Sequence, residues 1–153
     1  MGLQINVSIA GAEAIRDRMA KLGQDLYDFS EEMGATGKYL ADYFSTVPFA
    51  TLGRNYGTQW QEVSPKTLAA KLKRYPQNAH NTLQASGLMR DSFAFESDRL
   101  SATIGNQQPY FGYHQLGTGK APRRVMMAID ATNRAAVVRI ISEGVQARID
   151  ASR

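Results

Sequence analysis

The N-terminal segment alternates apolar and polar side chains: Leu3, Ile5, Val7 and Ile9 are separated by single polar residues. A period of two is typical of a strand that buries one face. Gly11 ends the alternation, and the spacing of apolar residues then changes to three and four. This change predicts that a helix follows the strand.

The helix is predicted to be long, because a single apolar stripe continues far along the chain. Pro48 predicts its end, since the residue before a proline is disfavoured in the α region. Bends are expected near Gly23 and near Gly34 and Gly37. The stripe packs onto the protein's own sheet or, as an alternative, onto a coiled-coil partner. It consists of Ile15, Met19, Leu22, Leu26, Phe29, Met33, Leu40, Phe44 and Val47.

Residues 48–63 show no clear period and predict an excursion without a strand. The lone Trp60 is interpreted as an anchor that packs this loop onto the domain, with a subunit interface as the alternative. Ser64 suits an N-cap and Pro65 the first helical position. A short helix is therefore expected from there to the residue before Pro76.

Residues 89–96 and 99–105 alternate in the manner of two strands, which predicts a β-hairpin. Ser97-Asp98 is the expected two-residue turn between them. The apolar segment 124–129, with the sequence RVMMAI, predicts a further strand.

The last apolar stripe predicts a C-terminal helix capped by Asp130 or Thr132. Together these elements predict one α+β domain over residues 1–153. A small, mainly antiparallel β-sheet is expected to pack against a long N-terminal helix and the C-terminal helix. An extended loop and the short helix occupy about residues 48–82. The buried face of the C-terminal helix is assigned to Ala136, Val137, Ile140, Ile141, Val145 and Ile149.

Charge is distributed unevenly along a chain whose net charge is +4. Residues 1–47 hold four Lys/Arg and seven Asp/Glu, residues 48–90 hold six and one, and residues 91–153 hold eight and six. The basic middle indicates a solvated face or, alternatively, contact with nucleic acid or an acidic protein surface.

Several classes of protein are disfavoured by composition. The chain has no cysteine, which excludes disulfides, thiolate metal sites and cysteine nucleophiles. No apolar run approaches the roughly 20 residues of a membrane helix. The N-terminus lacks a signal-peptide pattern, and Asn6 stands where myristoylation needs Ser or Thr. We expect no membrane partner.

Motifs that resemble catalytic ones are incomplete. The GTGK sequence at residues 117–120 would need a glycine at His114 and Ser or Thr at Ala121 to form a phosphate loop. His80 and His114 have no metal-ligand spacing. Ser86 lacks the flanking pattern of a nucleophile elbow. We expect no enzyme activity, no cofactor and no metal.

The carboxylates of the long helix offer no acid–base pair either. Asp25, Asp28, Glu31 and Glu32 are assigned to its polar, solvated face. The basic face of the short helix, which includes Lys66, is at most a sequence-independent signal for nucleic acid.

The stretch YFGYHQLGTGKAPRR, residues 110–124, predicts a short helix ended by Gly117 in a left-handed cap. Tyr110, His114, Gln115 and Gly117 are interpreted as a structural joint in which polar side chains satisfy loop backbone groups. A catalytic role for His114 is the alternative. Arg123 and Arg124 are candidates for a charge contact with a neighbour.

Five stretches resemble, in order, the phage virion morphogenesis family, also called tail completion proteins, and related minor tail and neck proteins. INVSIAGAEAIRDRMAKL resembles its strand and helix, and TQWQEVSPKTLAAKL its tryptophan and Thr-containing helix. LQASGLMRDSFAFE with SATIGNQQPYFGYHQLGTG resembles its turn, hairpin and His-Gln element. APRRVMMAID resembles its Pro-x-Arg segment.

The resemblance implies a structural virion protein in the tail-neck region, assembled in the bacterial host cytoplasm. Such a protein completes or terminates the tail and enables head–tail joining, as an oligomeric ring for which a hexamer is one option. Its partners would be copies of itself, the tail tube and head-neck connector proteins, with DNA in the ring lumen left open. The alternative functions are a basic nucleic-acid-binding module and an unrecognised hydrolase.

A closed ring needs two different patches that meet between subunits. The acidic N-terminal helices and the basic region 48–90 could supply opposite sides, so reversing the charge of Lys71, Lys73 and Arg74 together is expected to weaken assembly. The predicted interface residues are Trp60, Lys71, Lys73, Arg74, Arg123 and Arg124.

Overall fold

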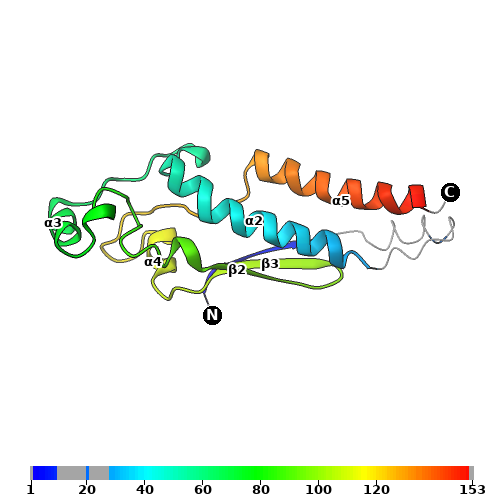
Figure 1. Cartoon of the computed structure of the whole chain (residues 1–153), viewed down its shortest axis with the longest axis horizontal. Helices are drawn as coiled ribbons and strands as arrows, with labels where there is room; N and C mark the ends of the chain where they lie inside the picture. Colours follow the sequence, from blue (N-terminus) through cyan, green and yellow to red (C-terminus); the bar gives the residue numbers. More distant parts are fainter. Residues whose placement is uncertain (1, 10–19, 21–27, 152–153) are drawn as a thin grey trace. The chain divides into compact units, whose positions relative to one another are not determined.

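The computed structural model describes residues 2–9, 20 and 28–151 of the chain. It confirms the predicted α+β class, with a three-stranded antiparallel sheet, an N-terminal helix and a C-terminal helix (Figure 1). In the described part of the chain, no helix is both long and apolar enough to cross a membrane. The elements are β1 (Gln4–Ser8), α2 (Ser30–Thr51), η1 (Arg54–Tyr56), α3 (Pro65–Arg74), η2 (Pro76–Asn78), η3 (Arg90–Ser92), β2 (Phe93–Ser97), β3 (Ser101–Asn106), α4 (Phe111–Leu116) and α5 (Ala131–Ala151).

The residues group into two compact units. Unit 1 consists of Met1–Gln4, Ala41–Ala94 and Gly105–Ala128, and unit 2 of Ile5–Leu40, Phe95–Ile104 and Ile129–Arg153. Helix α2 and the hairpin strands each contribute residues to both units, so neither unit is a contiguous piece of sequence.

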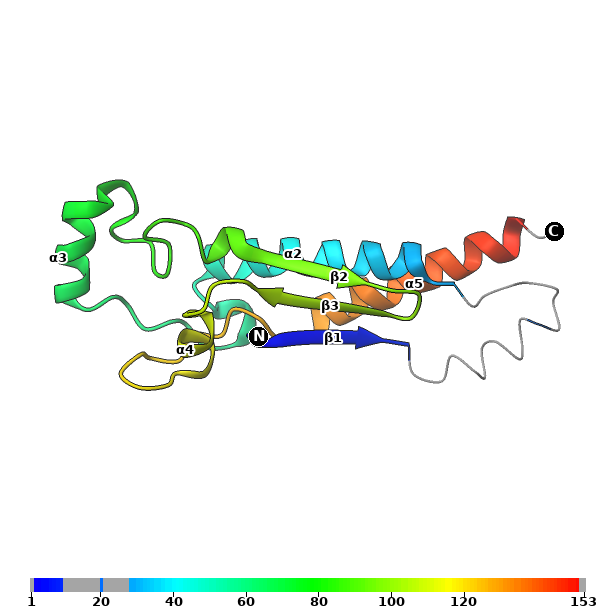
Figure 2. The same cartoon turned by 90° about the horizontal axis from the view of Figure 1, so that it is seen from below.

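The sheet has the order β1-β3-β2, so the predicted hairpin is present and its second strand is central (Figure 2). The predicted turn is wrong: the loop is Asp98–Leu100, not Ser97-Asp98. The Asp98 carboxylate accepts hydrogen bonds from the backbone N–H groups of Leu100 and Ser101, at 2.8 Å each. An aspartate that caps its own turn in this way stabilises a longer loop than the strand pattern alone indicates.

The prediction also placed the start of the first hairpin strand too early: residues 90–92 form the 3-10 turn η3, and β2 begins at Phe93. Within unit 2, the buried side chains of β3 are Ala102 and Ile104, both fully inaccessible. Leu100, expected on the same face, lies in the loop and is 39% exposed.

Helix α2 begins after Asp28, whose carboxylate accepts a hydrogen bond from the Ser30 N–H at 2.9 Å. The predicted part of the stripe before that point lies outside the described residues. The helix is continuous through Gly34 and Gly37, where bends were expected. A Cβ on Gly37 would lie 2.3 Å from Cδ2 of Phe95, so this glycine makes room for an aromatic ring.

The predicted end of α2 is wrong, because the helix passes through Pro48 and ends at Thr51. A proline removes one backbone hydrogen bond, yet tertiary packing can offset that loss. Here Pro48 and Phe49 are buried in unit 1, and the Phe49 ring contacts Trp60 with centroids 5.4 Å apart. The Thr51 hydroxyl also donates to the Val47 carbonyl at 2.8 Å.

The other aromatic residues of unit 1 form a chain of ring contacts. Phe44 lies 6.1 Å from Phe93, and Phe93 lies 5.6 Å from Phe111, measured between ring centroids. Helix α2, strand β2 and helix α4 therefore share one core in this unit.

Helix α5 begins as predicted at the Asp130 cap, whose carboxylate accepts from the Asn133 N–H at 2.8 Å. Its apolar face is less buried than expected: Val137 is buried at 9% exposure, whereas the other predicted positions are half-buried. In unit 2, part of the contact between α5 and α2 is made by an ion pair and not by apolar side chains.

The ion pair joins Arg148 of α5 to Glu32 of α2, with the guanidinium Nη2 at 2.6 and 2.5 Å from the two carboxylate oxygens. Glu32 is 5% exposed, so its predicted place on a solvated face is wrong. A Cβ on Gly144 would lie 2.1 Å from Glu32 Oε1, so glycine leaves the space that the carboxylate occupies. The Arg148 guanidinium also lies 5.3 Å from the centroid of the Phe29 ring.

Candidate functional site

Helix α4 carries the predicted structural joint and ends at Gly117 in the left-handed region, with φ 69°. A Cβ there would lie 2.6 Å from the Arg123 Cβ, so a side chain is excluded by both conformation and space. The Arg124 N–H donates to the His114 carbonyl at 2.7 Å. The chain therefore folds back directly over the end of α4.

Gln115 holds the returning segment by its side-chain amide. Its Oε1 accepts from the backbone N–H groups of Met126 and Met127, at 2.8 and 3.1 Å, and its Nε2 donates to the Met127 carbonyl at 2.8 Å. Both methionines are buried. Backbone groups that would otherwise be buried without partners are satisfied by one side chain.

Two aromatic side chains, those of Trp60 and Tyr56, also bind this segment. The Trp60 indole donates to the Val125 carbonyl at 3.0 Å, and the Tyr56 hydroxyl accepts from the Ala128 N–H at 3.3 Å. Trp60 is 4% exposed, and Gly53 leaves room for its ring. The predicted strand at residues 124–129 is wrong, because side chains here take the hydrogen-bonding role of a neighbouring strand.

Arg124 is buried at 6% exposure and binds the backbone of unit 1. Its guanidinium donates to the carbonyl of Gln61 from Nε and Nη2, at 3.0 and 2.8 Å, and to that of Glu62 from Nη2 at 3.3 Å. Arg124 was predicted to contact a neighbouring subunit. Its Nε and Nη2 instead bind carbonyls of unit 1. Its Nη1 makes no hydrogen bond within the described chain.

Helix α3 starts as predicted, with Ser64 accepting from the Thr67 N–H at 3.2 Å and proline in the first turn. Lys71 is buried at 7% exposure and donates from Nζ to the Asn81 carbonyl at 2.6 Å. Lys73 and Arg74 are exposed. One helix thus presents cations both inward and outward.

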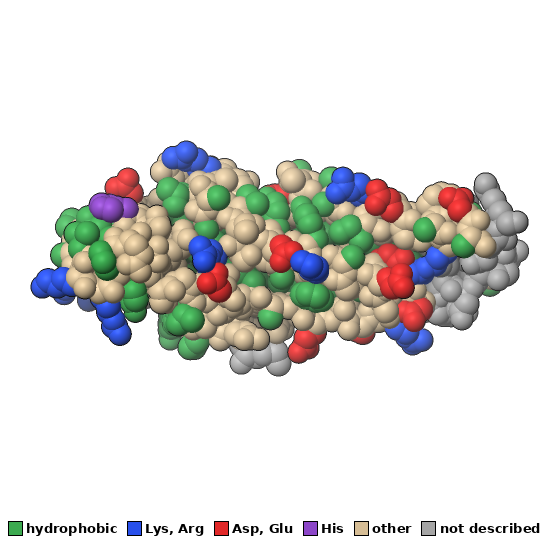
Figure 3. Space-filling view, in the orientation of Figure 1, with side chains coloured by type: hydrophobic (Ala, Val, Ile, Leu, Met, Phe, Trp, Pro, Cys, Tyr) green, Lys and Arg blue, Asp and Glu red, His purple; other side chains and the backbone are tan. Residues whose placement is uncertain are grey.

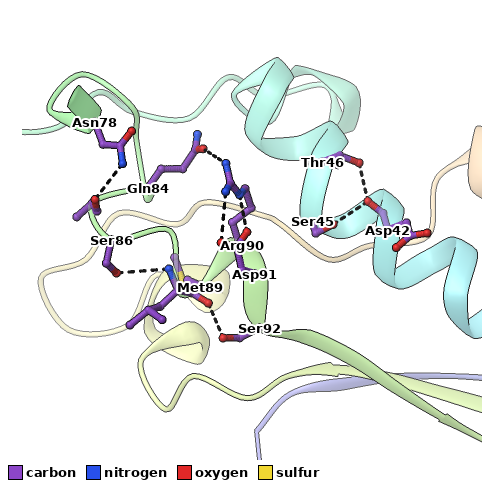
Figure 4. A network of polar contacts seen from close by, with 12 residues as sticks. Asp42, Ser45, Thr46, Asn78, Gln84, Ser86, Met89, Arg90, Asp91 and Ser92 are labelled. Carbon is purple, nitrogen blue, oxygen red and sulfur yellow. Dashed lines mark hydrogen bonds and ion pairs between the residues drawn. The ribbon is translucent and has the colours of Figure 1, made fainter. Parts of the chain in front are cut away.

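The loop after α3 is fixed by polar contacts (Figure 4). Asn78 donates to the Ala85 carbonyl at 3.2 Å, and Arg90 donates to the Gln84 side chain at 3.2 Å. Arg90 also pairs with Asp91 at 2.7 Å. The loop between α3 and β2 is therefore held in place by hydrogen bonds among its own residues.

These elements of unit 1 surround a cavity of about 600 Å³. That volume lies within the ~300–1,000 Å³ of typical ligand pockets. Among its lining residues, all of them described, the basic ones are Lys71, His114, Lys120 and Arg124, and Glu62 alone is acidic. The apolar part of the wall includes Val63, Leu83, Met89, Tyr110 and Pro122.

The basic residues of the cavity have lowered pKa values, chiefly because they are buried. Burial, and next the nearby Arg124 charge, lower the pKa of the Lys71 ammonium. The same two causes, in the same order, lower the pKa of His114. Burial lowers the pKa of Arg124 itself. His114 Nδ1 is buried without a hydrogen-bond partner in the described chain.

The structure thus gathers four of the predicted residues, Lys71, Tyr110, His114 and Arg124, around one cavity. Trp60, Gln115 and Gly117 instead hold the segment next to it. Lys73, Arg74 and Arg123 are exposed and do not line it. Lys120 was considered in the sequence only as part of GTGK, an incomplete phosphate loop, and was not predicted as a binding residue.

The basic side chains around the cavity are suited to binding an anion. The described residues contain no group of three or more His, Asp or Glu side chains that could hold a metal ion. A single half-buried histidine among cations, with one exposed carboxylate, offers no pair of opposed catalytic groups. Several donors around one recess favour recognition of negative charge.

Comparison with known proteins gives one match. The model of the phage virion morphogenesis family matches residues 10–146. No curated protein and no solved structure matches the chain.

Proposed function

Because this chain belongs to the phage virion morphogenesis family, we propose that it completes or terminates a phage tail and enables head–tail joining. It would act at the head-proximal end of the tail, as a ring of identical subunits that contacts the tail tube and the head-neck connector. The match over residues 10–146 supports a structural role in virion assembly, and the more specific role is our inference from it.

The observation that carries the ring is the charge difference between the two units. Unit 1 contains nine Lys/Arg and three Asp/Glu, whereas unit 2 contains nine and eleven. A closed ring joins two different patches of neighbouring subunits, and opposite charge is one way to make them complementary.

The exposed members of the predicted interface are Lys73, Arg74 and Arg123. Reversing Lys71 as well would disturb the fold, because its ammonium is buried and bonded to the Asn81 carbonyl. The double variant Lys73→Glu/Arg74→Glu is therefore the cleaner test. We expect it to lower oligomer content in sedimentation velocity with unchanged circular dichroism, and an unaltered oligomer would remove these residues from the interface.

Nucleic-acid binding is less well supported as a main function. Figure 3 shows, on the face that it draws, Lys and Arg side chains with Asp and Glu side chains next to several of them. Lys71 and Arg124 are recessed, so they cannot line up along a duplex backbone. A gel shift that persists at physiological salt would revive this alternative.

The decisive experiment is deletion of the gene from the phage that encodes it, followed by negative-stain electron microscopy of the lysate. We expect DNA-filled heads beside unattached tails. Tails of normal length would indicate completion or joining, and overlong tails would indicate termination. Intact, infectious virions would contradict the proposal, and restoration by the gene supplied in trans is the control.

A further inference from the structure

We propose that the cavity of unit 1 binds the carboxylate of an acidic side chain from a second copy of this chain, and that Glu96 in the β2–β3 hairpin supplies it. The inference rests on the proposed function, because it assigns one contact of the ring to two named surfaces.

The first argument is the supply of unused donors at the cavity. Lys71 Nζ makes one hydrogen bond and has two further N–H groups. Arg124 binds carbonyls through Nε and Nη2, and its Nη1 has no hydrogen bond to any residue that the structure describes. His114 Nδ1 is buried and unpartnered in the described chain. Lys120, which lines the same cavity, is exposed.

The second argument is that the chain does not neutralise these charges itself. Burial, and next the charge of Arg124, lower the pKa values of Lys71 and His114, as expected for buried basic groups without a counter-ion. Glu62 lines the cavity but is exposed, and Arg124 binds its backbone carbonyl. A carboxylate placed between these donors would form charge-assisted hydrogen bonds.

The third argument concerns the shape of the anion. The two strongest cations are almost inaccessible, Lys71 at 7% and Arg124 at 6% exposure. A phosphate in a duplex cannot enter such a recess, because the sugar and bases follow it closely. A carboxylate on a slender side chain can enter, and the apolar wall that includes Val63 and Met89 suits the methylene groups of a glutamate.

The fourth argument identifies the donor. Glu96 is exposed and makes no hydrogen bond or ion pair within the described chain. The same hairpin also exposes Phe95 and Leu100, at 38% and 39%. Its neighbour Asp98 instead binds its own turn. Within the described residues, Glu96 is therefore the carboxylate of the β2–β3 hairpin (Figure 2) that has no partner in its own chain, and it belongs to the unit with the acidic balance.

The test is a charge swap between the two surfaces. Lys120→Glu changes the exposed cation of the cavity, and Glu96→Lys changes its proposed partner; neither side chain makes a hydrogen bond in the described chain. Lys66→Glu is the matched control, because Lys66 is exposed in unit 1 but does not line the cavity. Oligomers are measured by sedimentation velocity and native mass spectrometry over a concentration series.

We expect each single swap to weaken association by about tenfold, and the chain with both swaps to recover most of that loss. Lys66→Glu should have less than about threefold effect. Losses that simply add in the double variant, or a Glu96→Lys chain that assembles like the original, would overturn the assignment.

A second measurement separates this inference from the ring itself. If the original chain stays monomeric, the ring is contradicted, and a fluorescent peptide of residues 93–102 is then titrated into it. Binding that Lys120→Glu abolishes would support the cavity assignment, and no binding would overturn it. Inorganic phosphate is titrated in parallel: phosphate binding together with an inert Glu96→Lys would show a free-anion site and refute the carboxylate donor.

Discussion

The two units bury charge in opposite ways. In unit 2, the Glu32 carboxylate is 5% exposed and meets the Arg148 guanidinium through both of its oxygens. In unit 1, Lys71 and Arg124 are about as deeply buried, yet both bind backbone carbonyls, and among the described residues neither is paired with a carboxylate. The first arrangement is electrically complete within the chain, and the second is not.

This difference separates a structural charge from one that is available for recognition. Carbonyl oxygens orient a cation but carry no net charge, so the positive field remains. A bidentate carboxylate cancels it. Burial alone therefore does not distinguish the two units, whereas the nature of the acceptor does.

The largest expected loss of stability comes from leaving the buried charge of unit 2 without its ion-pair partner. Arg148→Ala leaves Glu32 buried without its cation, which should lower the free energy of unfolding by about 3 kcal/mol, measured by urea denaturation. Glu32→Gln/Arg148→Met should recover part of this loss, because both charges are then absent. Arg139→Ala, an exposed change on the same helix, should stay within about 0.5 kcal/mol. If Arg148→Ala lowered the free energy of unfolding no more than Arg139→Ala does, the stabilising role of the Arg148–Glu32 ion pair would be refuted.

The next effect tests how far unit 1 depends on neutral hydrogen bonds. Gln115→Ala leaves the N–H groups of Met126 and Met127 without acceptors, so we expect a loss of about 2 kcal/mol in the same assay. Gln77→Ala, at an exposed glutamine of unit 1, is the control. Equal stability of the two variants would mean that the segment finds other partners.

A smaller effect is expected from Trp60→Phe. The change keeps most of the apolar contact with Phe49 but removes the indole N–H that donates to the Val125 carbonyl. The expected loss is about 1 kcal/mol, read from thermal unfolding. An unchanged unfolding temperature would mean that the hydrogen bond from Trp60 to Val125 does not contribute to stability and that only the apolar contacts of the ring do.

The smallest effect is the pH response of His114. Its pKa in the folded state lies below the ordinary value of 6.5, so the unfolded chain binds more protons between the two values. Stability from this group is complete above pH 6.5 and is lost as the pH falls through the folded pKa. His114→Gln should flatten that part of a stability curve measured by urea unfolding between pH 8 and about pH 5. A variant curve parallel to the original would contradict the shift.

What the sequence could predict was periodic or local. The Ser64-Pro65 start of α3, the Asp130 cap and the left-handed Gly117 each depend on near neighbours, and each is present. The continuation of α2 through Pro48 was not predictable in this way, because it depends on burial against Trp60.

The prediction of a strand at residues 124–129 was wrong for a related reason. An apolar run signals burial but does not say whether a strand or side chains will bind its backbone. The cavity was equally hidden: Lys71 and Lys120 carry no pattern that links them, and only the fold places them on one wall.

The hydrogen bonds to segment 124–128 also bear on the order of folding. The Trp60–Val125 and Arg124–Gln61 bonds join residues 65 and 63 positions apart, and the Arg148–Glu32 pair spans 116. Contacts that close such long loops form late, and a ribosome adds only ~5–20 residues each second. Unit 1 therefore cannot complete these bonds before Val125 has been made, and unit 2 cannot complete its ion pair before Arg148 has been made. A nascent copy has no finished surface to offer its neighbours, which would restrict assembly to released chains; pulse-labelled hydrogen exchange should show Trp60 among the last groups protected.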